Sequence, residues 1–334
     1  MSISAAQATN GRLWISWESH TRSRVLATAL NFELCEFTTL RRGAARYATL
    51  AFRTVRLLLK RRPGVLISQN PSLVLNALLA TLRPFLRFVW IVDAHNEAVR
   101  PFVNRNRTVA AISRALLRIA TLTIVSNDEL AATVVRYGGR AYTLPDGLPL
   151  VPGVAPRNFG HGFHFLAIAT FAPDEPIAAI FEAAKSLPDW ITIHFTGDPK
   201  RSATPLPQPA ANIRFLGYLP EPDYWAAILG CDAVIDISTM PDCLVCGAYE
   251  ALSACKPMLL ADNRASRSLF GSFSMFTSPT PADIKDALVA MACADRRSAP
   301  DLLAARSKYS LWWAERVTLL IHEINELSGS RASR

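Results

Sequence analysis

Residues 233–262 read AVIDISTMPDCLVCGAYEALSACKPMLLAD, with two short apolar runs on either side of a polar loop and a helical segment. The runs at 233–238 and 258–262 have the length of buried strands, and residues 246–254 have the period of a helix. Strand, helix and strand in this order are typical of a parallel sheet flanked by helices. The segment therefore predicts an α/β fold.

The same alternation extends in both directions and predicts two doubly wound, Rossmann-like domains facing a cleft. Further strands are expected at 13–17, 65–69, 88–93, 122–126, 164–169, 191–196 and 213–217. Helices are expected at 44–62, 72–82, 109–119, 129–137, 178–186, 223–229 and 282–292, followed by a long amphipathic one at 302–327. The pattern pauses at the Pro- and Gly-rich residues 145–153. We expect domains at 1–153 and 154–305, and a helix with a polar tail at 306–334.

Composition excludes several classes of protein. The chain has 334 residues, 50% of them hydrophobic and 19% charged, which is ample for two packed cores and too apolar for a disordered chain. No apolar run is long enough to predict a membrane-spanning helix, and residues 1–12 lack the pattern of a secretory signal. The six cysteines show no framework spacing, which is typical of a reducing compartment. These features predict a cytoplasmic protein.

Two familiar phosphate-binding motifs are absent from the sequence. There is no G-x-x-x-x-G-K-[ST], and no strand-to-helix turn carries G-x-G-x-x-G, so P-loop nucleotide hydrolysis and ordinary nicotinamide binding are disfavoured. Cys243 and Cys246 form a C-x-x-C pair, but no second pair or suitably spaced histidine accompanies them. We therefore expect no metal and no cofactor, and we expect these cysteines to pack a loop.

Two carboxylates stand eight positions apart in the opening segment. Asp242 lies in the predicted loop and Glu250 in the following helix, so both can point into one pocket and accept hydrogen bonds from sugar or ribose hydroxyls. The spacing leaves a second interpretation open, in which Asp242 caps the helix and Glu250 is solvated.

This segment resembles the E-x7-E region of retaining GT-B glycosyltransferases, group 1 and family 4-like. Glu250 and the following Ala-Leu-Ser-Ala-Cys-Lys-Pro match the second Glu and its helix, and Asp242 stands in place of the first Glu. Further similar segments follow in the family's order: His95 with Asn96 after a strand, LPDG at 144–147, FTGD at 195–198, NIRFLG at 212–217, CDAVIDIS at 231–238 and SLWW at 310–313.

The resemblance implies roles for particular residues. Glu250 would hold the nucleotide ribose, Asp242 and the backbone amides of residues 243–245 would hold the donor sugar, and His95 would line the donor site. The residues implied in nucleotide-sugar binding are Thr170, Gly197, Lys200, Arg201, Cys243, Leu244, Val245 and Glu250, and those expected on the acceptor side are Glu18, His20, Asn70 and Asn96. Where the family carries an Arg and a Lys after the first strand of the second domain, this chain reads ATFAPDEP at 169–176.

The mechanism implied by the family is retention, in which the leaving phosphate assists deprotonation of the acceptor. Lys200, Arg201 and the helix start after Asp242 are candidates to stabilise the leaving diphosphate. If Glu18 or His20 acts as a base, inversion becomes possible.

Charge is unevenly distributed along the chain. Residues 1–150 hold 20 Lys and Arg against 8 Asp and Glu, a balance of +12, and the remainder holds 16 against 19, a balance of −3, giving the total of +9. Five cations share one side of the helix predicted at 44–62: Arg42, Arg46, Arg53, Arg56 and Lys60. The opposite side, against the sheet, is expected to hold Tyr47, Ala48, Ala51, Phe52, Val55, Leu58 and Leu59. These cations can also be explained as an ordinary solvated face of the helix. We interpret the cations as a contact with anionic lipid.

The sequence as a whole predicts a cytoplasmic glycosyltransferase, peripherally attached to the inner face of the membrane. It would transfer sugar from a nucleotide-diphosphate sugar to a glycan or polyprenyl-diphosphate-linked acceptor in surface polysaccharide synthesis. Nucleic acid is disfavoured as a partner, because no binding motif or exposed aromatic side chain is expected beside the cations. A nucleotide-sugar epimerase and an inactive binding protein remain as alternatives.

Overall fold

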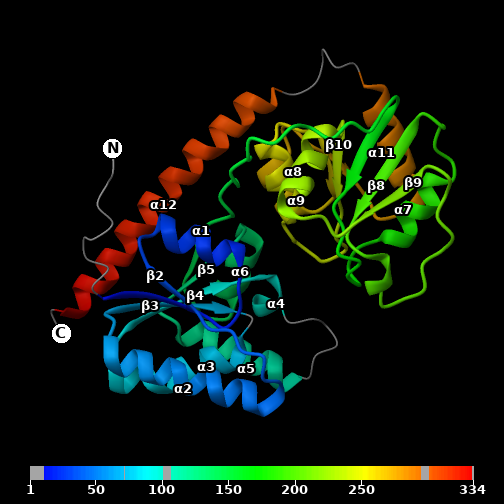
Figure 1. Cartoon of the computed structure of the whole chain (residues 1–334). Coiled ribbons are helices and arrows are strands. Elements are labelled where there is room, and N and C mark those ends of the chain that lie inside the picture. The colour runs from blue at the N-terminus through cyan, green and yellow to red at the C-terminus, as the bar shows by residue number, and fades with distance from the viewer. Residues whose placement is uncertain (1–10, 71, 101–106, 295–300, 333–334) are drawn as a thin grey trace. The chain divides into compact units, whose positions relative to one another are not determined.

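The structure is a computed structural model that describes residues 11–70, 72–100, 107–294 and 301–332. The expectation about an amino-terminal signal therefore falls almost wholly outside the described residues. The chain divides into two compact units, residues 1–147 with 312–334 and residues 148–311 (Figure 1). None of the helices among the described residues is long and apolar enough to cross a membrane.

The first unit is built on a six-stranded parallel sheet in the order β2-β1-β3-β4-β5-β6. The strands are β1 Arg12–Ser16, β2 Glu33–Glu36, β3 Val65–Asn70, β4 Val89–Ala94, β5 Leu122–Val125 and β6 Ala141–Thr143. The helices are α1 Thr21–Ala29, α2 Gly43–Arg61, α3 Leu73–Leu86, α4 Asn96–Val99, α5 Arg107–Ile119 and α6 Asp128–Arg136.

Two hydrophobic cores lie on the two faces of this sheet, because successive side chains of a strand point to opposite sides. Leu13 and Ile15 of β1 pack into the core formed with α2, α3, α5 and α6, whereas Trp14 between them packs into the core formed with α1 and α12. In Figure 1, α2, α3 and α5 lie together along one face of the sheet. The unit is a doubly wound, three-layer sandwich.

The second unit repeats this architecture. Its parallel sheet has the order β12-β11-β10-β7-β8-β9. The strands are β7 Phe163–Ala167, β8 Ile191–Thr196, β9 Ile213–Gly217, β10 Ala233–Asp236, β11 Met258–Ala261 and β12 Met275–Thr277. The helices are α7 Ile177–Ala184, α8 Glu221–Gly230, α9 Cys246–Ser253, α10 Arg264–Phe270 and α11 Pro281–Cys293, with a short 3-10 turn η1 at Pro199–Arg201.

A final helix, α12 Leu302–Ala332, starts in the second unit and belongs to the first from Trp312 onward. The indole Nε1 of Trp313 donates a hydrogen bond to the carbonyl of Pro145 at 2.9 Å, and the guanidinium of Arg316 lies 4.8 Å from the centre of the Tyr142 ring. Val317, Leu320 and Ile324 are buried in the core beneath it. The predicted return of the carboxy-terminal helix to the first domain is confirmed.

Candidate functional site

The carboxyl end of β10 carries a buried acid. Oδ2 of Asp236 accepts a hydrogen bond from the backbone N–H of Gly247 at 2.9 Å, in the first turn of α9. A Cβ at residue 247 would lie 2.5 Å from the same oxygen, so only glycine allows this approach. Burial raises the pKa of Asp236 well above its usual value, and the nearby carboxylates of Glu250, Glu175 and Asp174 add to the effect.

Glu250 lies on α9 beside this acid, where it accepts a hydrogen bond from the hydroxyl of Tyr224 on α8. Burial raises the pKa of Glu250, and the bond from Tyr224 offsets part of that rise. The pKa of Tyr224 is also raised, first by burial and then by the neighbouring carboxylate. Glu250 is thus a largely buried, partnered carboxylate, and the interpretation of it as a solvated helix residue is wrong.

Asp242 occupies the loop before α9 in the left-handed region, with φ at +53°, and is partly buried. The residue that caps α9 is Val245, so Asp242 is not its N-cap. Cys243 and Leu244 lie in the same loop, and the carbonyl of Cys243 accepts a hydrogen bond from Asn263 at 3.4 Å. None of the six cysteines forms a disulfide. The structure places Asp242 three residues before Val245, the N-cap of α9.

The loop after β7 is closed by one of its own acids. The carboxylate of Glu175 accepts hydrogen bonds from the backbone N–H groups of Thr170 and Phe171, at 3.0 and 2.8 Å, and from the Thr170 hydroxyl at 2.7 Å. Asp174 reaches in the other direction and accepts a hydrogen bond from the hydroxyl of Ser238 at 2.6 Å. The loops after β7 and β10 are therefore joined beside Asp236.

The loop after β8 holds the cations expected to meet a diphosphate. Gly197 has φ at +77°, and a Cβ there would lie 2.2 Å from the carbonyl oxygen of Ala169. Lys200 and Arg201 follow in η1, where both side chains are exposed. Lys200 also lines an open hollow of about 560 Å³ with residues 199 and 202–206. A larger cavity of about 760 Å³ lies at the opposite, amino-terminal edge of this sheet, away from these loops.

At the carboxyl edge of the first unit's sheet, a buried arginine of α1 joins the end of β4 to the segment that follows β6. Nε of Arg22 donates to Oδ1 of Asp93 at 3.0 Å, one terminal nitrogen pairs with Asp146, and the other donates to the carbonyl of Leu144 at 2.9 Å. Burial alone would lower the pKa of Arg22, but the carboxylates of Asp93 and Asp146 more than offset it and raise this pKa. The network fixes the end of β4, where His95 follows.

His95 lies beside this network and in contact with His20, with their ring centres 4.6 Å apart. Its Nε2 is 3.8 Å from Oδ2 of Asp93, and its backbone N–H donates to the carbonyl of Asn70 at 3.3 Å. Burial lowers the pKa of His95, and the charge of Asp93 offsets only part of that effect, which favours a neutral imidazole. Neither amide atom of the buried Asn70 side chain has a hydrogen-bond partner among the described residues.

The structure brings together most of the residues predicted on the acceptor side, but not Glu18. His20, Asn70 and His95 come together, with Asn96 adjacent as the first residue of α4. Glu18 is exposed and pairs with Arg46 at 3.4 Å instead.

The cationic side of α2 is exposed, but its hydrophobic residues are not all on the opposite side. Phe52 is 67% exposed and Leu59 is 55% exposed, whereas Leu50, Thr54 and Leu58 form the buried side. The expectation that Phe52 and Leu59 pack on the sheet is wrong, because Leu50, Thr54 and Leu58 already cover it. The expectation that no exposed aromatic side chain accompanies the cations is also wrong, because Phe52 is exposed on α2.

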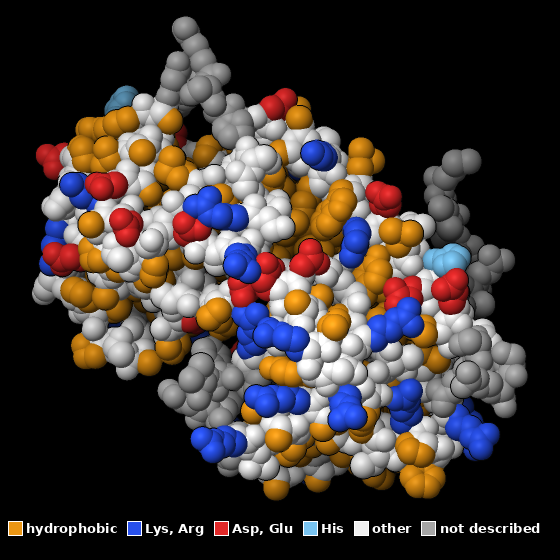
Figure 2. Space-filling model, turned by 180° about the vertical axis from the view of Figure 1, so that it is seen from behind, with side chains coloured by type: hydrophobic (Ala, Val, Ile, Leu, Met, Phe, Trp, Pro, Cys, Tyr) orange, Lys and Arg blue, Asp and Glu red, His pale blue; other side chains and the backbone are white. Residues whose placement is uncertain are grey.

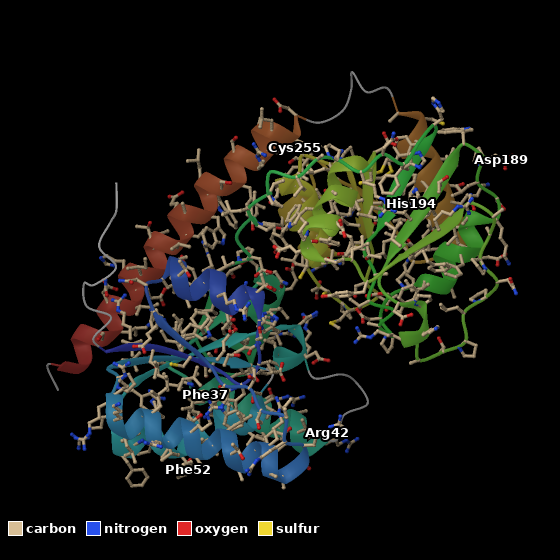
Figure 3. The ribbon with its side chains drawn as sticks, in the orientation of Figure 1. Phe37, Arg42, Phe52, Asp189, His194 and Cys255 are labelled. Carbon is tan, nitrogen blue, oxygen red and sulfur yellow. The ribbon has the colours of Figure 1, made fainter. Side chains whose placement is uncertain are left out.

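Two of the five cations on α2 are held by the protein, and the others are exposed. The guanidinium of Arg53 lies 4.7 Å from the centre of the Phe37 ring, and Arg46 donates to the carbonyl of Trp17 at 3.3 Å. Arg42, Arg56 and Lys60 are exposed. In Figure 3, Phe52 points away from the sheet and Arg42 lies at the start of the helix. Figure 2 shows, from behind, that Lys and Arg side chains interspersed with hydrophobic ones continue over this unit.

The structure was compared with known proteins. It is similar over 95% of its length to Anabaena HepE in complex with UDP-glucose, with a TM-score of 0.65, 15% identity and 91% of that chain covered. It is also similar to sucrose-phosphate synthase from Thermosynechococcus elongatus, with a TM-score of 0.68, 14% identity, and 96% and 98% of the two chains covered. The chain has the GT-B fold. A UDP-N-acetylglucosamine 2-epimerase described as putative, from Listeria monocytogenes, is similar as well, with a TM-score of 0.57, 9% identity, and 94% and 97% of the chains covered.

The amino-acid sequence does not assign the chain to a family. No family model matches the chain, and no curated protein sequence matches it. Among the described residues, no group of three or more His, Cys, Asp or Glu side chains is arranged to hold a metal ion.

Several residues of these GT-B units were not identified from the sequence. Asp236 ends an apolar strand, and a charge at such a position is itself a signal of a site, since carboxylates are rarely buried without a purpose. Asp93 carries a similar signal near the end of β4, whereas Arg22 carries none, because it lies in the polar helix α1. Tyr224 and Glu175 carry none, because each looks like an ordinary surface residue until the fold brings its partner near.

Proposed function

We propose that this protein is a glycosyltransferase that takes a sugar from a nucleotide-diphosphate donor bound to its second unit. The observation that carries the proposal is the partly buried Glu250, held by Tyr224 on the helix that follows β10 of a GT-B unit. In open α/β sheets, ligands bind outside the carboxyl ends of the strands. A structural neighbour with this fold was solved with UDP-glucose.

Glu250 is suited to hold a pair of ribose hydroxyls. An ionised carboxylate accepts two such bonds, and Tyr224 occupies only one of its oxygens, Oε2. We assign the donor sugar to Asp242 and the backbone amides of residues 243–245, and the diphosphate to Gly197, Lys200 and Arg201. The exposed cations would stabilise the negative charge that develops on the leaving group.

We place the acceptor at the carboxyl edge of the first unit's sheet. His20, His95 and Asn96 lie at this edge. The fully buried Asn70 lies behind them and accepts the backbone N–H of His95 on its carbonyl at 3.3 Å. The Arg22–Asp93 pair would hold the strand end that carries His95.

We propose retention of configuration, with His95 contacting the donor sugar and the leaving phosphate accepting the proton of the acceptor hydroxyl. Burial lowers the pKa of His95, and the neutral imidazole that this favours can donate or accept a hydrogen bond without adding charge. The proposal includes no metal or cofactor. A product of inverted configuration would make His20 the first candidate base.

We further propose that the acceptor is lipid-linked and that α2 contacts the inner face of the membrane. Exposed cations beside exposed Phe52 and Leu59 form the pattern of an interfacial helix, in which cations meet headgroups and apolar side chains enter the boundary below them. The product would then be a surface polysaccharide or glycoconjugate. Nucleic acid remains the less favoured partner, since the sequence contains no binding motif.

An epimerase is the second candidate. The similar fold of a 2-epimerase described as putative favours it, and so does the pair of neighbouring acids Asp236 and Glu250, because epimerisation needs groups that exchange protons with the substrate.

A panel of nucleotide sugars separates these functions. The protein is incubated with each donor, with and without polyprenyl-diphosphate-linked glycan, while nucleoside diphosphate and sugar products are measured. Acceptor-dependent release of nucleoside diphosphate supports the transferase. A new epimer without acceptor supports the epimerase, and binding with no product supports an inactive binding protein.

A further inference from the structure

The loop after β7 has the geometry of an anion-binding nest. Phe171 adopts φ of +60°, and its backbone N–H and that of Thr170 point to the same carboxylate of Glu175. The Thr170 hydroxyl adds a third donor. Successive N–H groups in such a conformation form concave sites for oxyanions such as phosphate.

The nest is held in shape by contacts that do not involve Glu175. The backbone N–H of Ala169 donates to Oγ1 of Thr196 on the neighbouring strand at 3.0 Å. The Phe171 side chain is 2% exposed and packs in the aromatic cluster with Phe195 and Phe215. Removal of the Glu175 side chain should therefore leave the three donors in place.

The carboxylate of Glu175 is unfavourable in a site for a nucleotide-diphosphate donor, because it would repel the diphosphate. Asp174, Asp236 and Glu250 lie near Glu175 on the same sheet edge, and the charge of Glu175 contributes to the raised pKa of Asp236. A diphosphate approaching these loops would meet a carboxylate already bound to the donors that suit a phosphate oxygen. The exposed Lys200 and Arg201 offer attraction from the next loop only.

We propose that Glu175 is an internal competitor for the phosphate site and that it sets the affinity for the donor. The nest on residues 170 and 171 receives a phosphate oxygen only when the carboxylate leaves. This inference rests on the proposed function, since it concerns the same donor. A ligand must offer an oxyanion that binds these donors better than the tethered carboxylate does.

Inorganic pyrophosphate is the probe, measured by isothermal titration calorimetry on the full chain. Glu175→Ala should bind it at least tenfold more tightly than the wild type, and Glu175→Gln should also bind more tightly. Asp174→Asn is the matched control, because it removes the same charge from the same loop and leaves the nest occupied. It should improve affinity by no more than about threefold, the scale of a screened charge effect.

Equal gains in Glu175→Ala and Asp174→Asn would overturn the inference, since they would show an effect of net charge alone. Unchanged pyrophosphate affinity in a folded Glu175→Ala would overturn it too. If that variant does not fold, Glu175→Gln decides, and an affinity equal to that of Asp174→Asn contradicts the proposal. Absence of sugar transfer in the donor panel, with the pyrophosphate gain present, would reject the proposed function but not the nest.

Discussion

The hydroxyl of Tyr224 on α8 donates a hydrogen bond to Oε2 of Glu250 on α9, 26 positions further along the chain. The bond fixes the orientation of a carboxylate that burial would otherwise protonate more readily. It therefore prepares Glu250 to accept ligand hydroxyls through its remaining lone pairs.

Replacement of Tyr224 by Phe should weaken binding of the nucleotide sugar about ten- to a hundredfold, the scale of one hydrogen bond to a charged group. The effect should grow as the pH falls, because the pKa of Glu250 rises further without its partner. Titration calorimetry at several pH values measures it. Tyr218→Phe is the control, since Tyr218 is 85% exposed. Equal affinities in the two variants would show that the bond has no part in binding.

A buried histidine pair should make stability depend on pH. Nδ1 of His164 and Nε2 of His194 are 3.2 Å apart, and burial, followed by the charge of His164, lowers the pKa of His194 to about 4. As the pH falls below 6.5, the unfolded chain gains a proton that the folded chain does not accept until about pH 4. The free energy of unfolding should fall across this window by up to about 3 kcal/mol.

Urea unfolding at pH 7, 6, 5 and 4.5 tests the dependence. His194→Gln should flatten the profile, and His322→Gln should not, because His322 is exposed. A wild-type slope in His194→Gln would assign the pH dependence to other groups.

Two glycines with similar backbone angles allow strain and collision to be separated. Gly197 has φ at +77° and a Cβ there would meet the Ala169 carbonyl oxygen at 2.2 Å, whereas Gly217 has φ at +73° and nothing within 4 Å. Gly217→Ala should cost about 1–2 kcal/mol from strain alone. Gly197→Ala should cost at least about 2 kcal/mol more. Thermal unfolding of the two variants measures both effects. Equal losses of stability would show that the loop around residue 197 shifts to accept the added Cβ at no energetic cost.

Membrane attachment through α2 should require its exposed side. The triple replacement of Arg42, Arg56 and Lys60 by Gln should reduce co-sedimentation with phosphatidylglycerol vesicles by about tenfold or more, since each cation contributes on the order of 1 kcal/mol. Phe52→Ala with Leu59→Ala should weaken binding without changing its salt dependence.

The control for the α2 variant removes the same number of cations from the second unit, by replacing Lys185, Lys285 and Lys308 with Gln. Phosphatidylcholine vesicles, which lack net charge, should bind every variant weakly. Equal retention of both triple variants on the anionic vesicles would contradict the assignment of α2 as the membrane contact.

The fold could be predicted largely from the sequence, because buried parallel strands such as Val65–Asn70 are short continuous apolar runs. Three strands were not predicted, and all are short edge strands with weak apolar signals: β2 is Glu-Leu-Cys-Glu, and β6 and β12 have three residues each. Helix α1 also escaped prediction, because it is polar on average and begins without a capping side chain.

The site was harder to predict than the fold. Glu250 could be found from its place in a local motif, but its partner Tyr224 could not, since their contact depends on the packing of α8 against α9. The pairing of Arg22 with Asp146 joins residues 124 positions apart. The nest held by Glu175 depends on a positive φ at Phe171, a conformation that no sequence rule assigns to phenylalanine.

The most direct test is the affinity of the wild type and of Glu250→Gln for a panel of nucleoside diphosphates, measured by titration calorimetry. The wild type should bind at least one nucleotide, and Glu250→Gln should bind it at least tenfold more weakly while Glu182→Gln, an exposed replacement on α7, binds it normally. Wild-type affinity in a folded Glu250→Gln would contradict the assignment of the donor site to this carboxylate.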